Sequence, residues 1–239
     1  MSIYKINNIA ELIRGNSYVG RGIVIGKSEN GQYACSAYFI MGRSANSRNR
    51  VFAERDGVLY TEPFDASKVE DPSLIIYAAQ RRLDNKLIVT NGDQTDTIYD
   101  GLKAGKSFKE SLEGRAFEPD FPNLTPRISG ILSFADNDFS YEMSILKSAD
   151  EKGSACNRYT FSYTALPGLG HFIHTYVGDG NPLPTFQGEP ERVAIPDDID
   201  EFSSALWDAL DHDNRISLYV RYTELETGAE ENRLINLNK

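Results

Sequence analysis

The segment Leu87–Ile98 joins a strand-like run, a tight turn and a helix start, and this combination can bind anions. Its apolar residues end at Asn91-Gly92, and the polar residues that follow begin a helix. An Asn-Gly pair permits turns with positive φ, and the free N–H groups of a first helical turn attract negative charge. We therefore predict an anion-binding cradle that includes Asn91, Gly92 and Thr95. The alternative is an ordinary turn in which Asp93 or Thr95 caps the helix.

The charge of the chain limits the ligands that such a cradle would serve. The chain has 239 residues and a formal net charge of −10, which argues against a nucleic-acid polymer because phosphate backbones need a broad basic face. An anionic small molecule would need a local basic pocket instead. Arg21, Arg43 and Arg127 are candidates for such a pocket, although each could equally be a strand-face charge or a salt-bridge partner.

No metal site is expected. His171 and His174 lie three residues apart on a predicted strand, where side chains alternate, so the two rings should point to opposite faces. The segment Gly178–Pro184 resembles a calcium loop but lacks the later glutamate and the flanking helices, so we expect a rigid active-site or interface loop. Cys35 and Cys156 lie in strand-like sequence without metal-ligand spacing, which predicts reduced, packed thiols.

Composition and length indicate one compact domain. Hydrophobic residues make up 40% and charged residues 25% of the chain. The N-terminus lacks a signal-peptide h-region and no apolar run is long enough to cross a bilayer, so we expect a cytoplasmic protein without membrane association. Residues 1–17 are expected to form an N-terminal helical extension, with a helix over Ile3–Gly15, and residues 18–239 a single domain.

Strands dominate the predicted elements, and the helices are segregated from them. Three hairpins are expected, with turns at Ser28–Gly31, at Asp56-Gly57 and at Asp84-Asn85, the last between Leu74 and Val89. Helices are predicted within Gln94–Arg115, restarting at the capping box Ser107–Glu110, and over Asp197–Asp211. Further strands are predicted at 127–134, 139–147, 159–164 and 171–177, and a final hairpin pairs 216–225 with 233–237. Runs of strands beside separate helices imply an α+β layered architecture.

Several sequence blocks occur together in an order and spacing that belong to one known family. The blocks, which cover roughly Tyr18 to Tyr176, are Tyr18-Val-Gly-Arg21, Arg43-Ser-Ala-Asn-Ser-Arg48, Asp71-Pro-Ser-Leu-Ile-Ile-Tyr77, Asn91-Gly-Asp-Gln-Thr-Asp-Thr-Ile98, Phe117-Glu118 and Thr125-Pro-Arg-Ile128. Together they resemble the archaeal-type IMP cyclohydrolases. The resemblance implies a fold like that of the N-terminal-nucleophile hydrolases. That fold is a four-layer αββα sandwich of two stacked, mainly antiparallel sheets.

The resemblance also implies an activity. These enzymes close the second purine ring by attack of a carboxamide nitrogen on a formyl carbon within one ribonucleotide, followed by loss of water. Because both reacting groups sit on one imidazole, the enzyme mainly holds the reactive conformer, moves protons and stabilises the developing oxyanion. No cofactor is implied. The expected partners are the nucleotide substrate and IMP, with a homo-oligomeric assembly.

Three residues match the family's catalytic positions. Arg48 would bind the formyl oxygen, Tyr77 would hydrogen-bond the reacting carbonyl or relay a proton, and Glu118 would exchange protons with the carboxamide or the leaving water. We expect Glu118 to be buried near Phe117 and Phe121. Without the resemblance, Arg48 would be interpreted as a solvated charge, Tyr77 as core and Glu118 as a helix end or surface residue. The residues expected to bind substrate by the same comparison are Arg21, Arg43, Asn91, Gly92, Thr95, Asp96, Arg127 and Thr175.

Two other functions stay open at this point. An N-terminal-nucleophile amidohydrolase would expose Cys35 or Ser36 after self-cleavage, which would remove the early hairpin from the 26.7 kDa chain. A non-catalytic purine-nucleotide-binding protein would keep the pocket and bind nucleotide without ring closure.

Overall fold

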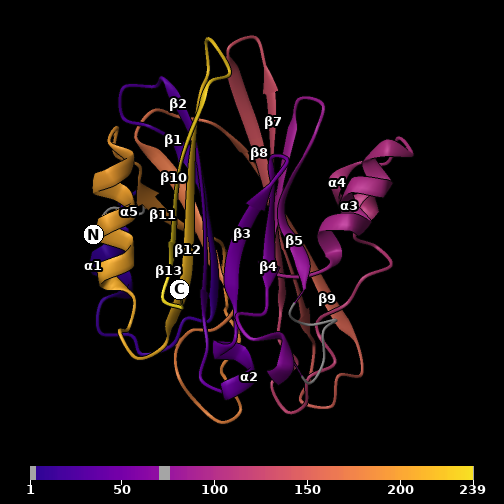
Figure 1. The fold of residues 1–239 in the computed structure, drawn as a ribbon. Helices are drawn as coiled ribbons and strands as arrows, with labels where there is room; N and C mark the ends of the chain where they lie inside the picture. The colour runs from indigo at the N-terminus through magenta and orange to yellow at the C-terminus, as the bar shows by residue number, and fades with distance from the viewer. Residues whose placement is uncertain (1–3, 70–75, 239) are drawn as a thin grey trace.

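Two antiparallel sheets stack face to face, and helices cover both outer faces (Figure 1). The computed structural model describes residues 4–69 and 76–238. Helices α1 (Ile9–Ile13) and α5 (Ile199–Ala209) lie on one outer face, and α3 (Gln94–Lys103) and α4 (Phe108–Ser111) on the other. The predicted α+β, four-layer αββα sandwich is confirmed.

The first sheet has six strands in the order β11-β10-β1-β2-β12-β13. Their bounds are β1 Arg21–Lys27, β2 Tyr33–Met41, β10 Leu169–His174, β11 Glu191–Ala194, β12 Arg215–Glu224 and β13 Glu230–Asn236. The predicted hairpin at Ser28–Gly31 joins β1 to β2, with Ile23 opposite Tyr38. The sheet therefore grows outward on both sides from a central hairpin.

The second sheet has seven strands and runs in simple chain order from β3 to β9. Their bounds are β3 Val51–Arg55, β4 Val58–Glu62, β5 Tyr77–Leu83, β6 Lys86–Thr90, β7 Arg127–Ala135, β8 Asp138–Ser148 and β9 Cys156–Thr164. Turns at Asp56-Gly57 and Asp84-Asn85 join β3 to β4 and β5 to β6, as predicted. Leu74, expected in the second of these hairpins, lies outside the described residues, as does Asp71 of the family-like block.

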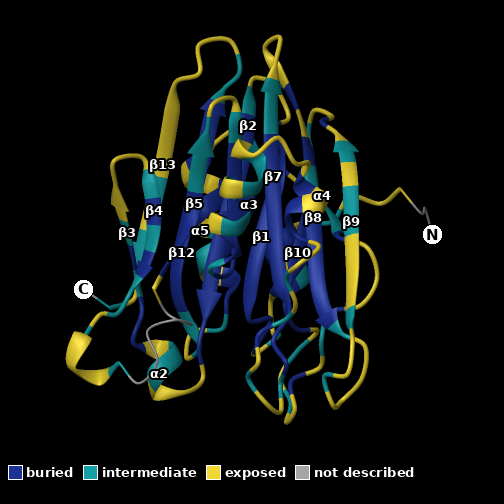
Figure 2. Ribbon diagram, turned by 90° about the vertical axis from the view of Figure 1, so that its right-hand side faces the viewer, coloured by how far each residue is buried: buried dark blue, intermediate teal, exposed yellow. Residues whose placement is uncertain are grey.

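Alternating side chains divide the core into layers. Ile23 and Ile25 of β1 pack between the two sheets, whereas Val24 packs under α1 and α5. A smaller cluster, which includes Ile98 of α3, lies between the second sheet and its helices. Figure 2 shows the central strands buried along most of their length, while the edge strands β9 and β13 carry exposed residues.

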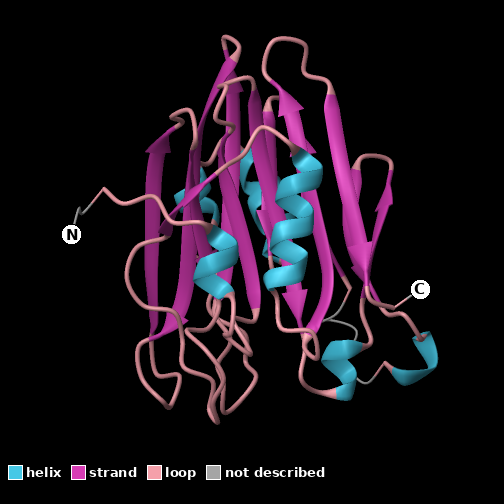
Figure 3. Cartoon of the chain, turned by 90° about the vertical axis from the view of Figure 1, so that its left-hand side faces the viewer, coloured by secondary structure: helices cyan, strands magenta, loops and turns pink. Residues whose placement is uncertain are grey.

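The N-terminal helix is shorter than predicted. It covers Ile9–Ile13 only, because the side chain of Asn8 caps its first N–H groups and Asn7 instead forms a bridge to Val193. Its buried side chains belong to the same core cluster as those of α5. Figure 3 shows the helices on this outer face of the first sheet. The restart of the other helical region at Ser107 is confirmed, with both hydrogen bonds of the capping box present. Within residues 4–69 and 76–238, no helix is long and apolar enough to span a membrane.

The core becomes polar at one end of the sandwich. β1, β5 and β7 begin at this end, and β2, β6 and β10 finish there, beside the short helix α2 (Ala45–Arg48) in Figure 1. Arg21, Tyr38 and Tyr77 occupy positions between the sheets where apolar residues stand farther along the same strands.

Candidate active site

A cavity of about 310 Å³ opens at this polar end. The start of β1, the segment after β2, the loop before β7 and the loop after β10 all contribute to its wall. The lining residues are Tyr18, Arg21, Arg43, Ser44, Asn46, Ser47, Arg50, Glu118, Asp120, Asn123, Thr125, Tyr176 and Leu183. Its size matches the lower range of small-molecule sites, and it has basic, acidic and phenolic groups in its wall.

Arg21 and Glu118 form a buried ion pair in this wall. Arg21 Nη2 donates a hydrogen bond of 2.8 Å to Glu118 Oε1. Burial alone would lower the pKa of Arg21, but Glu118 and then Tyr176 hold it above its usual value. Arg21 therefore stays charged. Glu118 is buried as expected, although Phe121 is 65% exposed, so a guanidinium rather than that aromatic ring faces its carboxylate.

Tyr77 and Tyr38 meet between the sheets beside Arg21. Their hydroxyl oxygens are 2.8 Å apart, and both rings are buried. Arg21 interacts electrostatically with both phenols. Burial raises the pKa of Tyr38 well above its usual value. The structure thus connects Tyr77 to the cavity wall through Tyr38 and Arg21. Sequence reasoning missed Tyr38, whose only indication was a polar tip in an otherwise apolar strand.

The structure brings Arg50, rather than Arg48, into the cavity. Arg48 is exposed and donates through Nη2 to Asn214 Oδ1 at 3.1 Å. Arg50 is only 6% exposed, lines the cavity, and acts electrostatically on Tyr18 and Tyr38. Its buried Nε has no hydrogen-bond partner, and no carboxylate in residues 4–69 or 76–238 forms an ion pair with it. Among the described residues, Arg50 thus supplies a charge without a carboxylate partner, and the comparison by sequence blocks did not identify it.

Arg43 lies at the rim of the cavity and is held there by the loop after β10. Its Nη1 donates to the carboxylate of Asp179 and, at 3.0 Å, to the carbonyl of Gly180. Its guanidinium also lies 5.0 Å from the centre of the Tyr18 ring. Leu183 of the same loop lines the cavity. The expectation that Gly178–Pro184 forms an active-site loop therefore agrees with its position.

A second carboxylate, Asp120, faces the cavity and is linked to Tyr176. Asp120 accepts hydrogen bonds from the Thr125 N–H at 2.6 Å and from the Thr125 hydroxyl. The Thr125 and Tyr176 hydroxyl oxygens are 2.5 Å apart. Tyr176 is buried and stacks on Tyr18 with ring centres 5.9 Å apart. No sequence pattern pointed to Asp120, and Tyr176 was noted only as the end of the family-like segment. The two residues become linked through Thr125 only when two loops meet.

The polar side chains of the predicted anion cradle form hydrogen bonds with other groups of the protein. Asn91 Oδ1 accepts from the Ile128 N–H and its Nδ2 donates to the Pro126 carbonyl, so the side chain fastens β7. Thr95 is fully buried, with its hydroxyl 2.6 Å from that of Thr90. The expectation of positive φ was wrong, because neither Asn91 nor Gly92 has one. Glycine is favoured at position 92 because neighbouring side chains lie close to where a Cβ atom would be.

A Cβ atom at Gly92 would lie 2.5 Å from Arg127 Nη1 and 3.7 Å from Glu118 Oε1. Arg127 itself is paired with Asp93 at 2.6 Å and donates to Gln94 at 2.8 Å. The pKa of Asp93 is lowered, because Arg115 and Arg127 outweigh its burial. Gly92 thus lies close to Glu118, and Arg127, the arginine of this segment, is already paired with Asp93.

The remaining predicted substrate-binding residues also lie outside the cavity wall. Asp96 is exposed and pairs with Arg81 at 2.7 Å. Thr175 is fully buried, and its hydroxyl oxygen accepts from the Arg21 N–H at 3.1 Å. It positions the start of β1. Their roles in binding stay predictions.

The two strand histidines face opposite sides, as predicted. His171 Nδ1 lies 2.7 Å from the Tyr141 hydroxyl, and its ring stacks on Tyr163 of the second sheet. His174 Nδ1 lies 2.7 Å from the Tyr176 carbonyl, and its ring stacks on Phe172. Within the described ranges, no three His, Cys, Asp or Glu side chains gather as metal ligands.

Cys35 and Ser36 do not reach the cavity. Both are buried in the middle of β2, which pairs with β1 on one side and with β12 on the other. Neither cysteine forms a disulfide. An N-terminal nucleophile at either position would require cleavage within a central strand.

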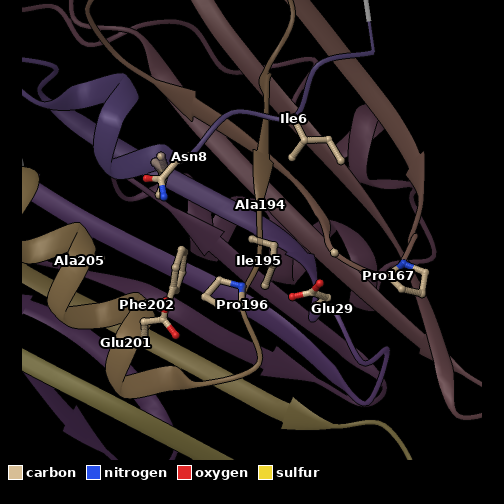
Figure 4. A pocket seen from close by; sticks show the side chains of 12 residues that line it. Ile6, Asn8, Glu29, Pro167, Ala194, Ile195, Pro196, Glu201, Phe202 and Ala205 are labelled. Atoms are coloured by element: carbon tan, nitrogen blue, oxygen red, sulfur yellow. The ribbon is translucent and has the colours of Figure 1, made fainter.

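A larger cavity of about 500 Å³ lies elsewhere, between α1, α5 and the β1–β2 turn. Figure 4 shows the carboxylates of Glu29 and Glu201 among its mainly apolar side chains. No arginine or lysine lines it, so it would repel a nucleotide phosphate despite its size. The smaller cavity has the chemistry that an anionic ligand needs.

Comparison with known proteins identifies the family of this chain. The model of a family described as IMP cyclohydrolase-like protein matches residues 18–228. The IMP cyclohydrolase of Methanopyrus kandleri is 35% identical over 115 residues, 47% of this chain and 57% of that protein. That of Methanococcus aeolicus is 31% identical over 133 residues, 51% of this chain and 64% of its own. The matches thus span less than two thirds of either relative. Because the family match covers most of its length, this chain belongs to the IMP cyclohydrolase-like protein family.

Proposed function

We propose that this chain is an IMP cyclohydrolase, which converts formamidoimidazole carboxamide ribonucleotide to IMP. The observation that supports this most strongly is the convergence of Arg50 and the Arg21–Glu118 pair on one cavity, with the hydrogen-bonded Tyr38 and Tyr77 phenols near Arg21. The relatives named IMP cyclohydrolase match only part of their length, so they support this proposal without deciding it.

The reaction needs positioning and proton transfer. The carboxamide nitrogen forms a C–N bond to the formyl carbon, and the former carbonyl oxygen becomes a hydroxyl when it gains a proton. The C–O bond then breaks, and the oxygen leaves as water with a further proton, while the former formamide nitrogen loses its proton. Charge develops on the oxygen in the first step, so a fixed cationic donor lowers that barrier.

The groups in the cavity fit these tasks. We assign Arg50 to the formyl oxygen, the role that sequence comparison gave to Arg48, because its guanidinium is buried and has no carboxylate partner among the described residues. Glu118 would exchange protons with the reacting oxygen, and Arg21 fixes its orientation. Tyr77 would act together with Tyr38, whose hydroxyl it contacts, and both phenols interact electrostatically with Arg21.

Arg43 is suited to the substrate phosphate. It lies at the rim, where its side chain is 36% exposed and that of its partner Asp179 is 48% exposed, whereas Arg21 and Arg127 are buried and paired with Glu118 and Asp93. Removal of the guanidinium by Arg43→Met should therefore raise KM more than it lowers kcat. A KM unchanged within twofold would reject this assignment.

Incubation with the formylated ribonucleotide, followed by IMP absorbance, tests the proposal. Appearance of IMP at micromolar enzyme is the expected result. Nucleotide binding by calorimetry without IMP formation would support the non-catalytic alternative. No binding and no product would reject both.

We further propose a homo-oligomer that acts in the cytoplasm on nucleotide alone. The resemblance suggests the assembly, and the net charge of −10 disfavours nucleic acid as a partner. Light scattering of the purified chain tests the oligomeric state.

A further inference from the structure

We infer that Tyr176, Thr125 and Asp120 form a proton relay that takes the carboxamide proton during ring closure. This inference rests on the proposed function and adds a residue, Tyr176, that would contact the reacting nitrogen. All three side chains line the same cavity. They come from two segments far apart in the chain, the loop before β7 and the loop after β10.

The direction of the hydrogen bonds follows from counting protons. The Thr125 hydroxyl has one hydrogen, which it donates to the carboxylate of Asp120. Its oxygen must therefore accept in the contact of 2.5 Å with Tyr176, so the Tyr176 hydroxyl donates. The lone pairs of the Tyr176 oxygen remain available on the cavity side. That oxygen can accept from an N–H group of the substrate.

A concerted shift of three protons along these hydrogen bonds conserves atoms and charge. As the carboxamide nitrogen attacks the formyl carbon, its proton passes to the Tyr176 oxygen. The original Tyr176 proton moves to Thr125, and the Thr125 proton moves to Asp120, which becomes a neutral carboxylic acid. No phenolate forms. This suits Tyr176, because burial raises its pKa above the usual value, although Arg21 opposes that effect.

The proposed relay gives Glu118 and Asp120 different roles in proton transfer. One oxygen of Glu118 is engaged by Arg21. Asp120 accepts only from Thr125 among the described side chains. Glu118 can thus serve the oxygen that leaves as water while Asp120 receives the proton of the nucleophile. A purely structural reading is that Asp120 fastens its loop, and the experiment must separate the two.

The test compares kcat, KM and the solvent isotope effect in four variants. Tyr176→Phe, Thr125→Val and Asp120→Asn should each lower kcat by about 10²- to 10⁴-fold, the usual contribution of general base catalysis. KM and the dissociation constant of IMP should change less than about threefold. Thr125→Ser keeps the hydroxyl and should restore kcat to within about fivefold of the wild type. Tyr222→Phe, which removes a buried phenol that donates to Pro196 far from this cavity, serves as the matched control.

Proton inventory separates a relay from a structural role. In mixtures of H₂O and D₂O, kcat of the wild type should fall along a curve that requires more than one proton in flight, and Thr125→Ser should keep that curve. An Asp120→Asn variant that loses thermal stability but keeps kcat within threefold would overturn the relay. If Thr125→Val fails to fold, Asp120→Asn, which keeps the shape of the side chain, decides the matter. If the wild type makes no IMP, the proposed function fails first and the relay with it.

Discussion

Replacing Arg50 and Arg48 separately gives the sharpest test of how this site works. Arg50→Met removes the guanidinium but keeps a flexible chain of similar length in the cavity wall. Arg48→Met makes the same change two residues away, where the side chain is exposed and contacts only Asn214 among the described side chains. The two variants make the same Arg-to-Met change and differ only in the position of the arginine that is removed.

The magnitude follows from the role assigned to Arg50. Loss of one preorganised donor to a developing oxyanion costs about 10²- to 10³-fold in kcat, or about 3 to 4 kcal/mol of barrier. Arg50→Met should show that loss in the IMP absorbance assay. Arg48→Met should stay within about threefold of the wild type, because an exposed side chain with one neutral hydrogen bond contributes little.

The stability of the Arg50→Met variant should rise although its kcat falls. Arg50 is 6% exposed and has a buried Nε without a hydrogen-bond partner, so folding desolvates it without full compensation. Arg50→Met should therefore raise the free energy of unfolding in urea by about 1 kcal/mol while it lowers kcat. If instead Arg48→Met abolishes activity and Arg50→Met retains it, the assignment made from the cavity geometry is wrong.

Three further outcomes are expected. Tyr77→Phe breaks the contact with Tyr38 and should lower kcat by about 10²-fold with KM nearly unchanged; equal kcat in steady-state assays would remove Tyr77 from the mechanism. Gly20 has φ +78° and a Cβ there would lie 2.6 Å from the Tyr176 ring, so Gly20→Ala should lower the free energy of unfolding by about 2 kcal/mol and disturb nucleotide binding measured by calorimetry. Burial lowers the pKa of His171 from 6.5 to about 4, so the folded state disfavours its protonation and stability is lost as pH falls from about 6.5 toward about 4. Urea unfolding at about pH 7.5 and about pH 5 should show that His171→Gln removes about 2 kcal/mol of this pH dependence, and an unchanged dependence would contradict the buried neutral ring.

Local pattern was enough to predict most elements of the fold. Turn residues such as Asp56-Gly57 and the capping box at Ser107 act on their immediate neighbours, so the sequence shows where they interrupt or start an element. The helix predicted over Ile3–Gly15 was too long. Its amphipathic pattern begins before Asn8, which caps the start of the observed helix. Segregation of helices from strands correctly indicated a layered α+β protein.

The cavity depended on contacts that no local pattern contains. Glu118 and Arg21 were singled out by resemblance, and the structure pairs them at 2.8 Å across 97 positions of chain. The choice between Arg48 and Arg50 could not be made from spacing. It depends on how the short helix α2 turns the segment, which exposes one guanidinium and buries the other.

The sequence by itself therefore determined the strands, the turns, the layered class and the family, because these follow from neighbouring residues and from blocks read in order. Tertiary structure alone decided which charges are neutralised, which remain free, and which hydroxyl groups touch. Those properties depend on the distances between side chains of different loops, and only the stacking of the two sheets fixes these distances.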